Sequence, residues 1–477
     1  MTRAFLALTS TLALAACAVG PDYVAPVARP AATAPLLTAG APVSLAQPDG
    51  DWWRLYNDPV LDGLIADALA ANTDIRVAVA RLEKARASLR GARADRLPST
   101  GLSAGANYGR YPEIQRLPGF DSEQWRVDAG LNVGYEVDLF GRVSRNIEAA
   151  RGDLAASEAD TDAVRVAIVA DTTRAYVDAA AAAERIAVAE HIVELLDGSV
   201  RVIGRRAEVG RAERLDVARI SALREQRRAE IPQIVAERQA ALYRLATLTG
   251  REPSQLPEIA GAAKAAPGLT QAIPVGDGAA LLARRPDIRA AERRLAAATA
   301  RIGVATAELY PKISLGGSVG STGTGLSDIF GGGPLRWLLG PLISWNFPNQ
   351  AAARARIAGA EADSRGALAS FDGSVLRALE ETSTALSNYA RALDRRRTLT
   401  SAQAEAGTAV RIVRARQREG TGDFLDVLDA ERTNAEAQAA LADADARVAG
   451  AQVDLFRALG GGWQSAAATP PAPRNGT

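Results

Sequence analysis

Few residues in this sequence have side chains that support catalysis or metal binding. The chain of 477 residues contains one histidine, His191, and one cysteine, Cys17. A protein zinc site uses three or four nitrogen, sulfur or oxygen ligands, and no second histidine or cysteine stands near His191. The glycines at 331–333 lie between two predicted strands, whereas a phosphate-binding loop leads into a helix. We therefore predict that the chain is not an enzyme and that it uses no metal and no cofactor.

Cys17 has another chemistry open to it, the attachment of lipid to its thiol. The apolar run before it is too short to span a bilayer as a helix, and residues 1–16 are typical of a signal peptide. The ending Leu14-Ala15-Ala16-Cys17 resembles the lipobox of bacterial lipoproteins, which implies cleavage before Cys17 and lipidation of its thiol. Ala18 implies, by the same resemblance, sorting to the outer membrane. The alternative is an ordinary signal peptide with an accidental cysteine.

The composition favours long, closely packed helices over a thick globular core. Hydrophobic residues make up 48% of the chain but aromatic residues only 5%, so alanine and small aliphatic residues dominate. The net charge of +1 is spread along the chain, without the basic patch of a nucleic-acid-binding protein. After the signal peptide, no segment has the ~20 uninterrupted apolar residues of a transmembrane helix. A membrane crossing would therefore require a closed β-barrel.

Two long helices, predicted at 142–209 and 350–419, must position any functional residues. From Ile168 to Ile203 the apolar and small residues of the first segment recur at alternating steps of four and three. This spacing is typical of the seam of a helix packed along a neighbouring helix. Neither segment contains proline, and at ~1.5 Å per residue each helix would extend roughly 100 Å.

Shorter elements surround these helices. Helical spacing and the absence of proline predict one helix from about 60 to 97, and another helix extends from 214 to 248. Between residues 125 and 139, apolar side chains alternate with charged residues and glycine, and aromatic residues lie towards both ends of the apolar face. This pattern matches a strand between lipid and water, although a strand half-buried on a soluble core is the alternative. Similar alternation predicts strands at 101–108, 313–319 and 337–347.

The chain is an internal duplication of helix, two strands, long helix, turn and helix. Matching residues recur at an offset of 213 in the earlier part of each copy and at 210 near the ends of the long helices. At offset 213, Asp287-Ile288-Arg289 repeats Asp74-Ile75-Arg76 and Pro311 repeats Pro98; at offset 210, Gly420 repeats Gly210 and Leu425-Asp426-Val427 repeats Leu215-Asp216-Val217.

The duplication sets the predicted regions of the chain. A proline- and alanine-rich stretch without a period separates the signal peptide from the first copy and is read as a tether. The regions are a signal peptide at 1–16, a lipidated tether at 17–50, the first repeat at 51–250, a connector at 251–275, the second repeat at 276–460 and a disordered tail at 461–477.

Four strands per chain cannot close a membrane barrel, because the smallest such barrels have about eight strands. An open sheet edge in lipid would leave backbone groups unpaired. The chain must therefore oligomerise. Three copies would supply twelve strands, although the sequence by itself also permits a dimer.

Several short motifs, taken together, resemble one known family. They are Cys17-Ala18-Val19-Gly20-Pro21-Asp22-Tyr23, Trp52-Trp53, Tyr135-Glu136-Val137-Asp138-Leu139-Phe140-Gly141-Arg142, Arg284-Arg285-Pro286-Asp287-Ile288, Tyr310-Pro311 and Leu425-Asp426-Val427-Leu428-Asp429-Ala430. From Cys17 to Trp463 the chain resembles the outer membrane factor family, the TolC-like exit ducts, and within it the lipoprotein branch that serves drug efflux pumps.

The resemblance implies an α+β membrane protein that assembles as a homotrimer. Its twelve-stranded outer-membrane β-barrel would continue into a long periplasmic α-helical coiled-coil tunnel, with lipid on Cys17 as an additional anchor. The implied function is an exit duct for drugs and other toxic small molecules, with a periplasmic adaptor protein and an inner-membrane pump as partners and no nucleic acid. The alternatives are the duct of a protein or peptide secretion system and a structural lipoprotein that bridges envelope layers.

The resemblance also implies an acidic constriction at Asp426 and Asp429, with Asp216 as the counterpart in the first repeat. Threefold symmetry would gather six carboxylates around a narrow axis, where they repel one another and attract cations. The alternative is that Asp426 caps the helix that starts after Gly422 and that Asp216 is a cap or an inter-helix partner. Some relatives carry an arginine where this chain has Gly422, so a latch made by that arginine is in doubt.

Two pairs of residues mark turns and joints. Gly210 and Gly420 are expected in the left-handed conformation where the long helices reverse, and the resemblance implies that these turns face the adaptor. Pro98 and Pro311 end helices before strands, and the resemblance makes them the joint between barrel and tunnel.

Overall fold

The computed structural model describes residues 18–27, 42–47, 50–110, 112–115, 119, 121–269, 271–325, 327, 335–419 and 421–462. The signal peptide, Cys17, Gly420 and most of the predicted tail lie outside these residues. The chain forms two compact units. The first comprises Met1–Pro26, Arg81–Glu158 and Ala290–Asp372, and the second comprises Val27–Ala80, Ala159–Arg289 and Gly373–Thr477.

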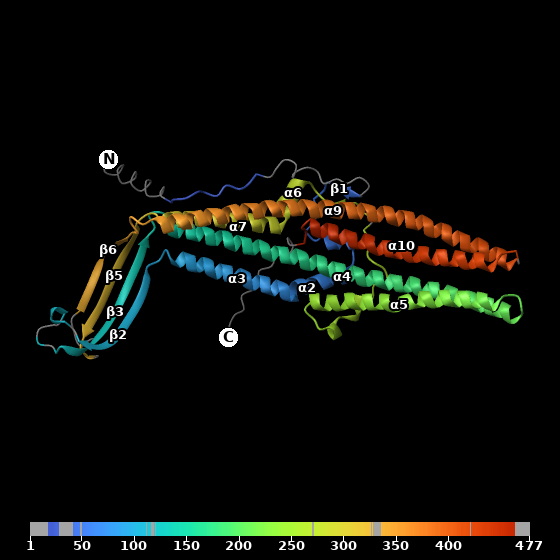
Figure 1. Cartoon of the computed structure of the whole chain (residues 1–477), viewed down its shortest axis with the longest axis horizontal. Helices are drawn as coiled ribbons and strands as arrows, with labels where there is room; N and C mark the ends of the chain where they lie inside the picture. The colour runs from blue at the N-terminus through green and yellow to red at the C-terminus, as the bar shows by residue number, and fades with distance from the viewer. Residues whose placement is uncertain are drawn as a thin grey trace. The chain divides into compact units, whose positions relative to one another are not determined.

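The first unit contains a four-stranded antiparallel sheet (Figure 1). Its strands are β2 (Ser99–Arg110), β3 (Glu123–Val137), β5 (Lys312–Gly323) and β6 (Leu335–Ser344), paired in the order β2-β3-β5-β6. The central pair joins the two sequence repeats, because β3 belongs to the first and β5 to the second. Within the described residues, β2 and β6 are the edge strands.

Register aligns the apolar residues of all four strands on one face of the sheet. Leu102 lies opposite Leu131, Leu131 opposite Val319, and Val319 opposite Trp337. Leu102 is 83% exposed and Trp337 is 73% exposed. A continuous apolar face on the surface of the chain needs an apolar environment or a partner to cover it.

The opposite face of the sheet carries charged and hydroxyl side chains. Asp128 of β3 accepts a hydrogen bond from Thr322 of β5 and pairs with Arg336 of β6 at 3.6 Å. Arg126 approaches the same carboxylate at 3.2 Å. The predicted alternation is therefore present in the folded sheet, with one apolar and one polar face.

The second unit is helical. Its elements include η2 (Trp52–Tyr56), α2 (Pro59–Ala71), α5 (Arg214–Leu248), α6 (Gly278–Arg284) and α10 (Phe424–Ala458), with the short parallel strands β1 (Val43–Ser44) and β4 (Ile273–Pro274) and the turns η4 (Pro253–Gln255) and η5 (Glu258–Gly261). Four further helices contribute residues to both units, namely α3 (Thr73–Ala94), α4 (Arg142–Glu208), α7 (Pro286–Ala307) and α9 (Ala351–Arg418). In the described part of the chain, every helix is either too short or too polar to cross a membrane.

Trp52 lies at the centre of the main core of the second unit and is fully buried. Its ring stacks on Phe456 of α10, with 4.6 Å between centroids, and meets Trp53 and Tyr56 edge-on. Aromatic side chains each bury a large apolar area. This cluster therefore fixes the segment before α2 against the end of α10.

Corresponding elements of the two repeats have matching lengths. α4 has 67 residues and α9 has 68, while α5 and α10 have 35 each. α3 and α7 have 22 residues each. The long helices begin and end within about one residue of the predicted bounds. The predicted end of the first repeat, residue 250, follows α5, and the predicted start of the second repeat, residue 276, precedes α6. These boundaries between the repeats stay a prediction.

The prediction of one helix from about 60 to 97 is wrong, because the structure contains two helices that meet at Asn72. Asn72 has an extended backbone (φ −60°, ψ 135°). Its side-chain oxygen accepts hydrogen bonds from the backbone N–H groups of Asp74 (2.8 Å) and Ile75 (3.2 Å), and its amide donates to the carbonyl of Leu248 (2.9 Å). Asparagine is a favoured N-cap residue, so Asn72 starts a new helix where the apolar spacing continues undisturbed.

Candidate functional site

The two turns that join the long helices to their partners in the second unit are closed in the same way. At the first turn, the N–H of Arg211 donates to the carbonyl of Arg206 at 2.7 Å; at the second, Thr421 donates to Arg416 at 3.1 Å. Gly210 has φ +70°, as predicted. A left-handed residue with such a bond terminates an α-helix by satisfying its last carbonyl groups. Both residue pairs are related by the repeat offset of 210.

Gly422 follows the second turn and packs closely against the end of α9. A Cβ atom at this position would lie 3.0 Å from the backbone nitrogen of Gln417 and 3.2 Å from Arg416. These distances are shorter than ordinary van der Waals contact. An arginine at this position would therefore require the end of α9 to move, which gives a steric reason for glycine here.

α10 begins with three aspartates that have different environments. Asp423 is the N-cap, and its carboxylate accepts a hydrogen bond from the N–H of Leu425 at 3.2 Å. Asp426 and Asp429 follow three residues apart, so they lie on the same face of the helix, and both are exposed. Asp429 also pairs with Arg432 at 2.8 Å. The capping role considered for Asp426 therefore belongs to Asp423.

Asp216 and its repeat counterpart Asp426 each stand third in their helices, but Asp216 has a capping contact of its own. It lies at the third position of α5, where its carboxylate accepts a hydrogen bond from the N–H of Glu213 at 3.4 Å. The Glu213 side chain in turn accepts from the backbone of the same turn, which completes a capping box. Asp216 therefore contributes to the start of α5. The structure places only Asp426 and Asp429 together on one helix face.

Glu431, which was not predicted as a functional residue, is the buried charge nearest to the acidic pair on α10. Its side chain is 4% exposed and pairs with Arg414 of α9 at 3.0 Å. Ser199 of α4 donates to the same carboxylate at 2.9 Å. Val427 and Ala435, four residues before and after Glu431, are also buried. The sequence signal for Glu431 is therefore a charge at a position of the apolar seam.

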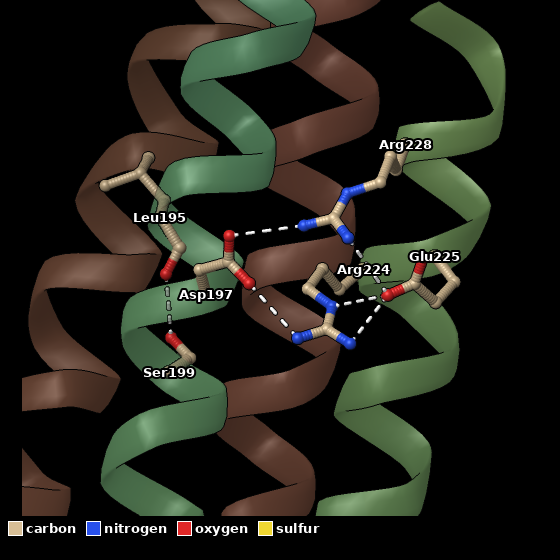
Figure 2. Close-up of polar contacts among 6 residues, drawn as sticks. All are labelled: Leu195, Asp197, Ser199, Arg224, Glu225 and Arg228. Atoms are coloured by element: carbon tan, nitrogen blue, oxygen red, sulfur yellow. Dashed lines mark hydrogen bonds and ion pairs between the residues drawn. The ribbon is translucent and has the colours of Figure 1, made fainter.

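The segment of α4 around Ser199 is bound to two other helices. Figure 2 shows Asp197 between Arg224 and Arg228 of α5, with distances of 3.1 and 3.4 Å, and Glu225 beside Arg224. Ser199 points elsewhere and contacts α10, since residues two apart on a helix diverge by ~200°. The α4 segment is thus fixed to α5 through Asp197 and to α10 through Ser199, whose partner Glu431 also pairs with Arg414 of α9.

A groove of about 910 Å³ lies beside this junction, between α4, α9 and α10. Its walls include arginine side chains from two helices that are more than 200 residues apart in sequence. A positively charged groove attracts anionic groups. The lining includes Arg201, Arg205, Arg206, Arg411, Arg414 and Arg418, together with Glu194 and Glu431.

The arginine motif before α7 stabilises the end of α10. Arg284 donates to the carbonyl of Leu459 at 2.7 Å, and burial lowers the pKa of Arg284 to about 10. Arg285 donates to the carbonyl of Ala458 at 2.9 Å and pairs with Glu381 of α9 at 2.7 Å. Cations at the end of a helix satisfy its last carbonyl groups. This motif therefore has a structural role in the second unit.

The predicted joint residues lie directly before strands in the first unit. Pro98 precedes β2 and Pro311 precedes β5, each a few residues after the end of a helix. Phe140, between β3 and α4, stacks on Tyr310 with 4.6 Å between ring centroids. The junctions of the two repeats therefore contact each other.

The described residues contain no cluster of three or more histidine, cysteine, aspartate or glutamate side chains with an arrangement suited to a metal ion. His191 is exposed and lies 3.7 Å from Glu194 on the same helix.

The chain matches the family model described as "Outer membrane efflux protein" over residues 64–251 and 279–461. It is 33% identical over 463 residues to Outer membrane protein OprJ of Pseudomonas aeruginosa, covering 96% of this chain and 95% of that protein. It is 30% identical over 472 residues to Antibiotic efflux pump outer membrane protein ArpC of Pseudomonas putida, covering 97% and 96%. The solved structure of the outer-membrane channel OprN is similar, with 38% identity and a TM-score of 0.87 over 94% of this chain and all of that chain.

Proposed function

Because this chain belongs to the outer membrane efflux protein family, we propose which of its residues form the working parts of an efflux duct. The protein is located in the outer membrane and acts as an exit duct, as the sequence predicts. Its fold class is that of the outer-membrane channels, which confirms the predicted class. The two alternatives, a secretion duct and an envelope-bridging scaffold, are not favoured.

The observation that carries this function is the exposed apolar face of the sheet. Leu102, Leu131, Val319 and Trp337 form one row across four strands, and the opposite face carries Asp128 and its polar partners. Such a sheet suits a wall with lipid on one side and water on the other. The long helices continue from its strands, so the same chain supplies the wall beyond the membrane.

A homotrimer is the assembly we propose. The edge strands β2 and β6 present backbone groups that need partners in lipid. Three copies joined edge to edge give twelve strands, which is above the minimum for a closed wall with a lumen. Each copy would contribute one acidic pair from α10 to the same axis.

The proposed gate is this ring of carboxylates from Asp426 and Asp429. Both side chains are exposed in the single chain, as residues that line a water-filled opening must be. Glu431, one turn further on, holds α10 to α4 and α9 through Ser199 and Arg414. Opening the ring requires α10 either to break these contacts or to move together with α4. Asp216, in the capping box of α5, is proposed as a support of the neighbouring turn.

The partners we propose are a periplasmic adaptor protein and an inner-membrane pump. The turns at Gly210 and Gly420 would contact the adaptor, since each ends a long helix that begins shortly after a strand of the sheet. ArpC is named as part of an antibiotic efflux pump, and we propose drugs and similar small molecules as the cargo here. Pro98 and Pro311 are proposed as the joint between the membrane wall and the tunnel.

Conductance across a planar lipid bilayer tests the duct directly. The purified full-length protein should produce discrete conductance steps, because a closed wall encloses water. A protein that scaffolds the envelope would produce none. Expression with its adaptor and pump in a bacterium that lacks its own efflux duct should lower the accumulation of a fluorescent pump substrate, and unchanged accumulation would contradict the efflux role.

A further inference from the structure

The segment directly after Cys17 packs against α4, α7 and the turn before α4 in the first unit. The N–H of Val19 donates to the carbonyl of Phe140 at 3.2 Å. Ala18 lies so close to Gly141 that a Cβ on Gly141 would be 2.8 Å from its Cα and Cβ atoms. Gly141 also has φ +77°, a conformation that other residues rarely adopt. Glycine at this position therefore makes room for the N-terminal segment.

A second close approach joins the segment to α7. A Cβ on Gly20, which has φ +92°, would lie 2.5 Å from the Cα of Gly303. A Cβ on Gly303 would in turn lie 2.8 Å from the side chain of Arg145. Backbone packs against backbone here, and the contact requires glycine on both sides.

Arg145 of α4 binds the segment through most of its donors. Its side chain is only 7% exposed, and it pairs with Asp22 at 2.6 Å. It also donates to the carbonyl groups of Val19 (3.4 Å) and Gly20 (3.5 Å), and to Glu148 of its own helix (2.9 Å). A buried guanidinium is costly unless its donors are satisfied. The N-terminal segment supplies three of these acceptors.

Tyr23 extends the contact to the second repeat. Its hydroxyl donates to Glu292 of α7 at 2.9 Å. The segment therefore crosses from α4 of the first repeat to α7 of the second. We call residues 18–23 the strap.

The strap begins beside a group of aromatic side chains at the helix-side ends of the strands. Its partner Phe140 stacks on Tyr310, and Trp345 stacks on Phe347 with 4.7 Å between centroids. Tyr310, Trp345 and Phe347 are 41%, 46% and 66% exposed. Exposed aromatic residues at the ends of membrane strands mark the boundary between lipid and water.

We propose that the strap fixes where the lipid of Cys17 enters the membrane, with Arg145 as the positioning residue. Ala18, the residue bonded directly to Cys17, packs on Gly141 next to Phe140, at the aromatic boundary. The acyl chains are thereby delivered into the leaflet next to the sheet instead of at the end of a free tether. The inference rests on the outer-membrane function and on lipidation of Cys17.

The test compares Arg145→Met in the lipidated protein and in a Cys17→Ser background, using the full-length chain. If the strap positions the lipid, Arg145→Met lowers the amount of assembled protein in the outer membrane several-fold in the lipidated chain. It has little further effect in the Cys17→Ser chain, because the two changes act on one step and are not additive. Arg165→Met is the matched control, since Arg165 lies on the same helix and pairs with Asp162.

Two results of this comparison, and a third from fatty-acid labelling, would overturn the proposal. If Arg145→Met lowers the amount of assembled protein equally in both backgrounds, the strap stabilises the fold and does not position the lipid. If the amount of assembled protein is unchanged in the lipidated chain, Arg145 is not a positioning residue. Asp22→Ala repeats the comparison without altering the interior, because the Asp22 side chain is 87% exposed. Labelled fatty acid that fails to enter the unmodified chain also overturns it. Conductance of that chain separates these results from a failure of the duct function.

Discussion

Asp426 and Glu431 lie five residues apart on α10, and their carboxylates have opposite environments. Asp426 is exposed at the start of the helix, whereas Glu431 is buried and bound by side chains of α4 and α9. An exposed carboxylate acts on ions in the water around it, and a buried one fixes its neighbours. Asp426 is therefore suited to the proposed gate, and Glu431 to holding α10 against α4 and α9.

Replacing both exposed aspartates tests the gate. We expect Asp426→Ala combined with Asp429→Ala to leave assembly intact and to raise single-channel conductance in planar bilayers, because the repelling carboxylates and their bound cations are removed. The combined Asp426→Asn and Asp429→Asn variant is the control for side-chain size. Unchanged conductance in the alanine variant would remove the gate assignment.

Replacing the buried glutamate tests the junction of the helices. Glu431→Gln leaves Arg414 without its charged partner, and we expect a loss of roughly 1–3 kcal/mol in the free energy of unfolding. Thermal unfolding of the detergent-solubilised protein measures this loss. Glu436→Gln, which breaks an exposed pair with Arg227, should change stability by less than ~1 kcal/mol. Equal effects of the two variants would argue against a special role for Glu431.

Tyr23 provides a pH test of the strap. Burial, together with the hydrogen bond to the Glu292 carboxylate, raises the pKa of Tyr23 from 10.0 to about 12. Because the folded pKa is raised, the contribution of Tyr23 to stability is fully present below pH 10 and is lost as the pH rises through 12. Absorbance near 295 nm, compared between the unmodified chain and Tyr23→Phe, should assign one tyrosine titration to the upper end of this range. A midpoint near 10 would show that the contact is absent in solution.

At the scale of elements, helix ends are fixed by residues that lie outside the repeating apolar pattern. Asn72 starts α3 in the middle of continuous helical spacing, and Gly250 and Gly460 end α5 and α10 with φ of +69° and +70°. Periodicity predicts that a helix exists, because one buried face is enough to create it. A cap inside the pattern depends on a contact with a distant segment, here the carbonyl of Leu248, which local spacing does not specify.

Substitution of Gly250 tests how strongly the end of α5 depends on glycine. A Cβ at Gly250 would lie 2.6 Å from the carbonyl oxygen of Ala71, and the left-handed backbone itself costs other residues ~1–2 kcal/mol. We expect Gly250→Ala to destabilise the protein by more than ~2 kcal/mol in thermal unfolding. Gly204→Ala, inside α4 and with open space around it, should be neutral or stabilising by up to ~1 kcal/mol.

At the scale of the whole molecule, local patterns predicted most elements, apart from the break at Asn72, but not the contacts between distant elements. The strands, the long helices and the glycine turn at Gly210 follow from residues close together in sequence. The arginine groove, the Ser199–Glu431 contact and the strap each join residues more than 100 positions apart. The offset between the repeats relates equivalent residues of the two copies, but it does not indicate which residues touch.

The number of chains in the assembly is the prediction that belongs to this scale. We expect native mass spectrometry of the detergent-solubilised protein to give three chains, since three sets of four strands close the sheet through β2 and β6. Ala104→Pro in β2 should lower the fraction of trimer, because proline removes a backbone donor and disrupts an edge pairing. A stable dimer, or a monomer that still conducts, would contradict this assembly.

The nearly equal lengths of α4 and α9, and of α5 and α10, limit how the protein can change during evolution. An insertion of one heptad in α4 alone would shift its turn by ~10 Å past the turn of α9 and break the contacts of Ser199 and Asp197. A longer duct therefore needs matched insertions in four helices at once. A single insertion would break these contacts, so the four helices together set one fixed length for the helical part of the protein.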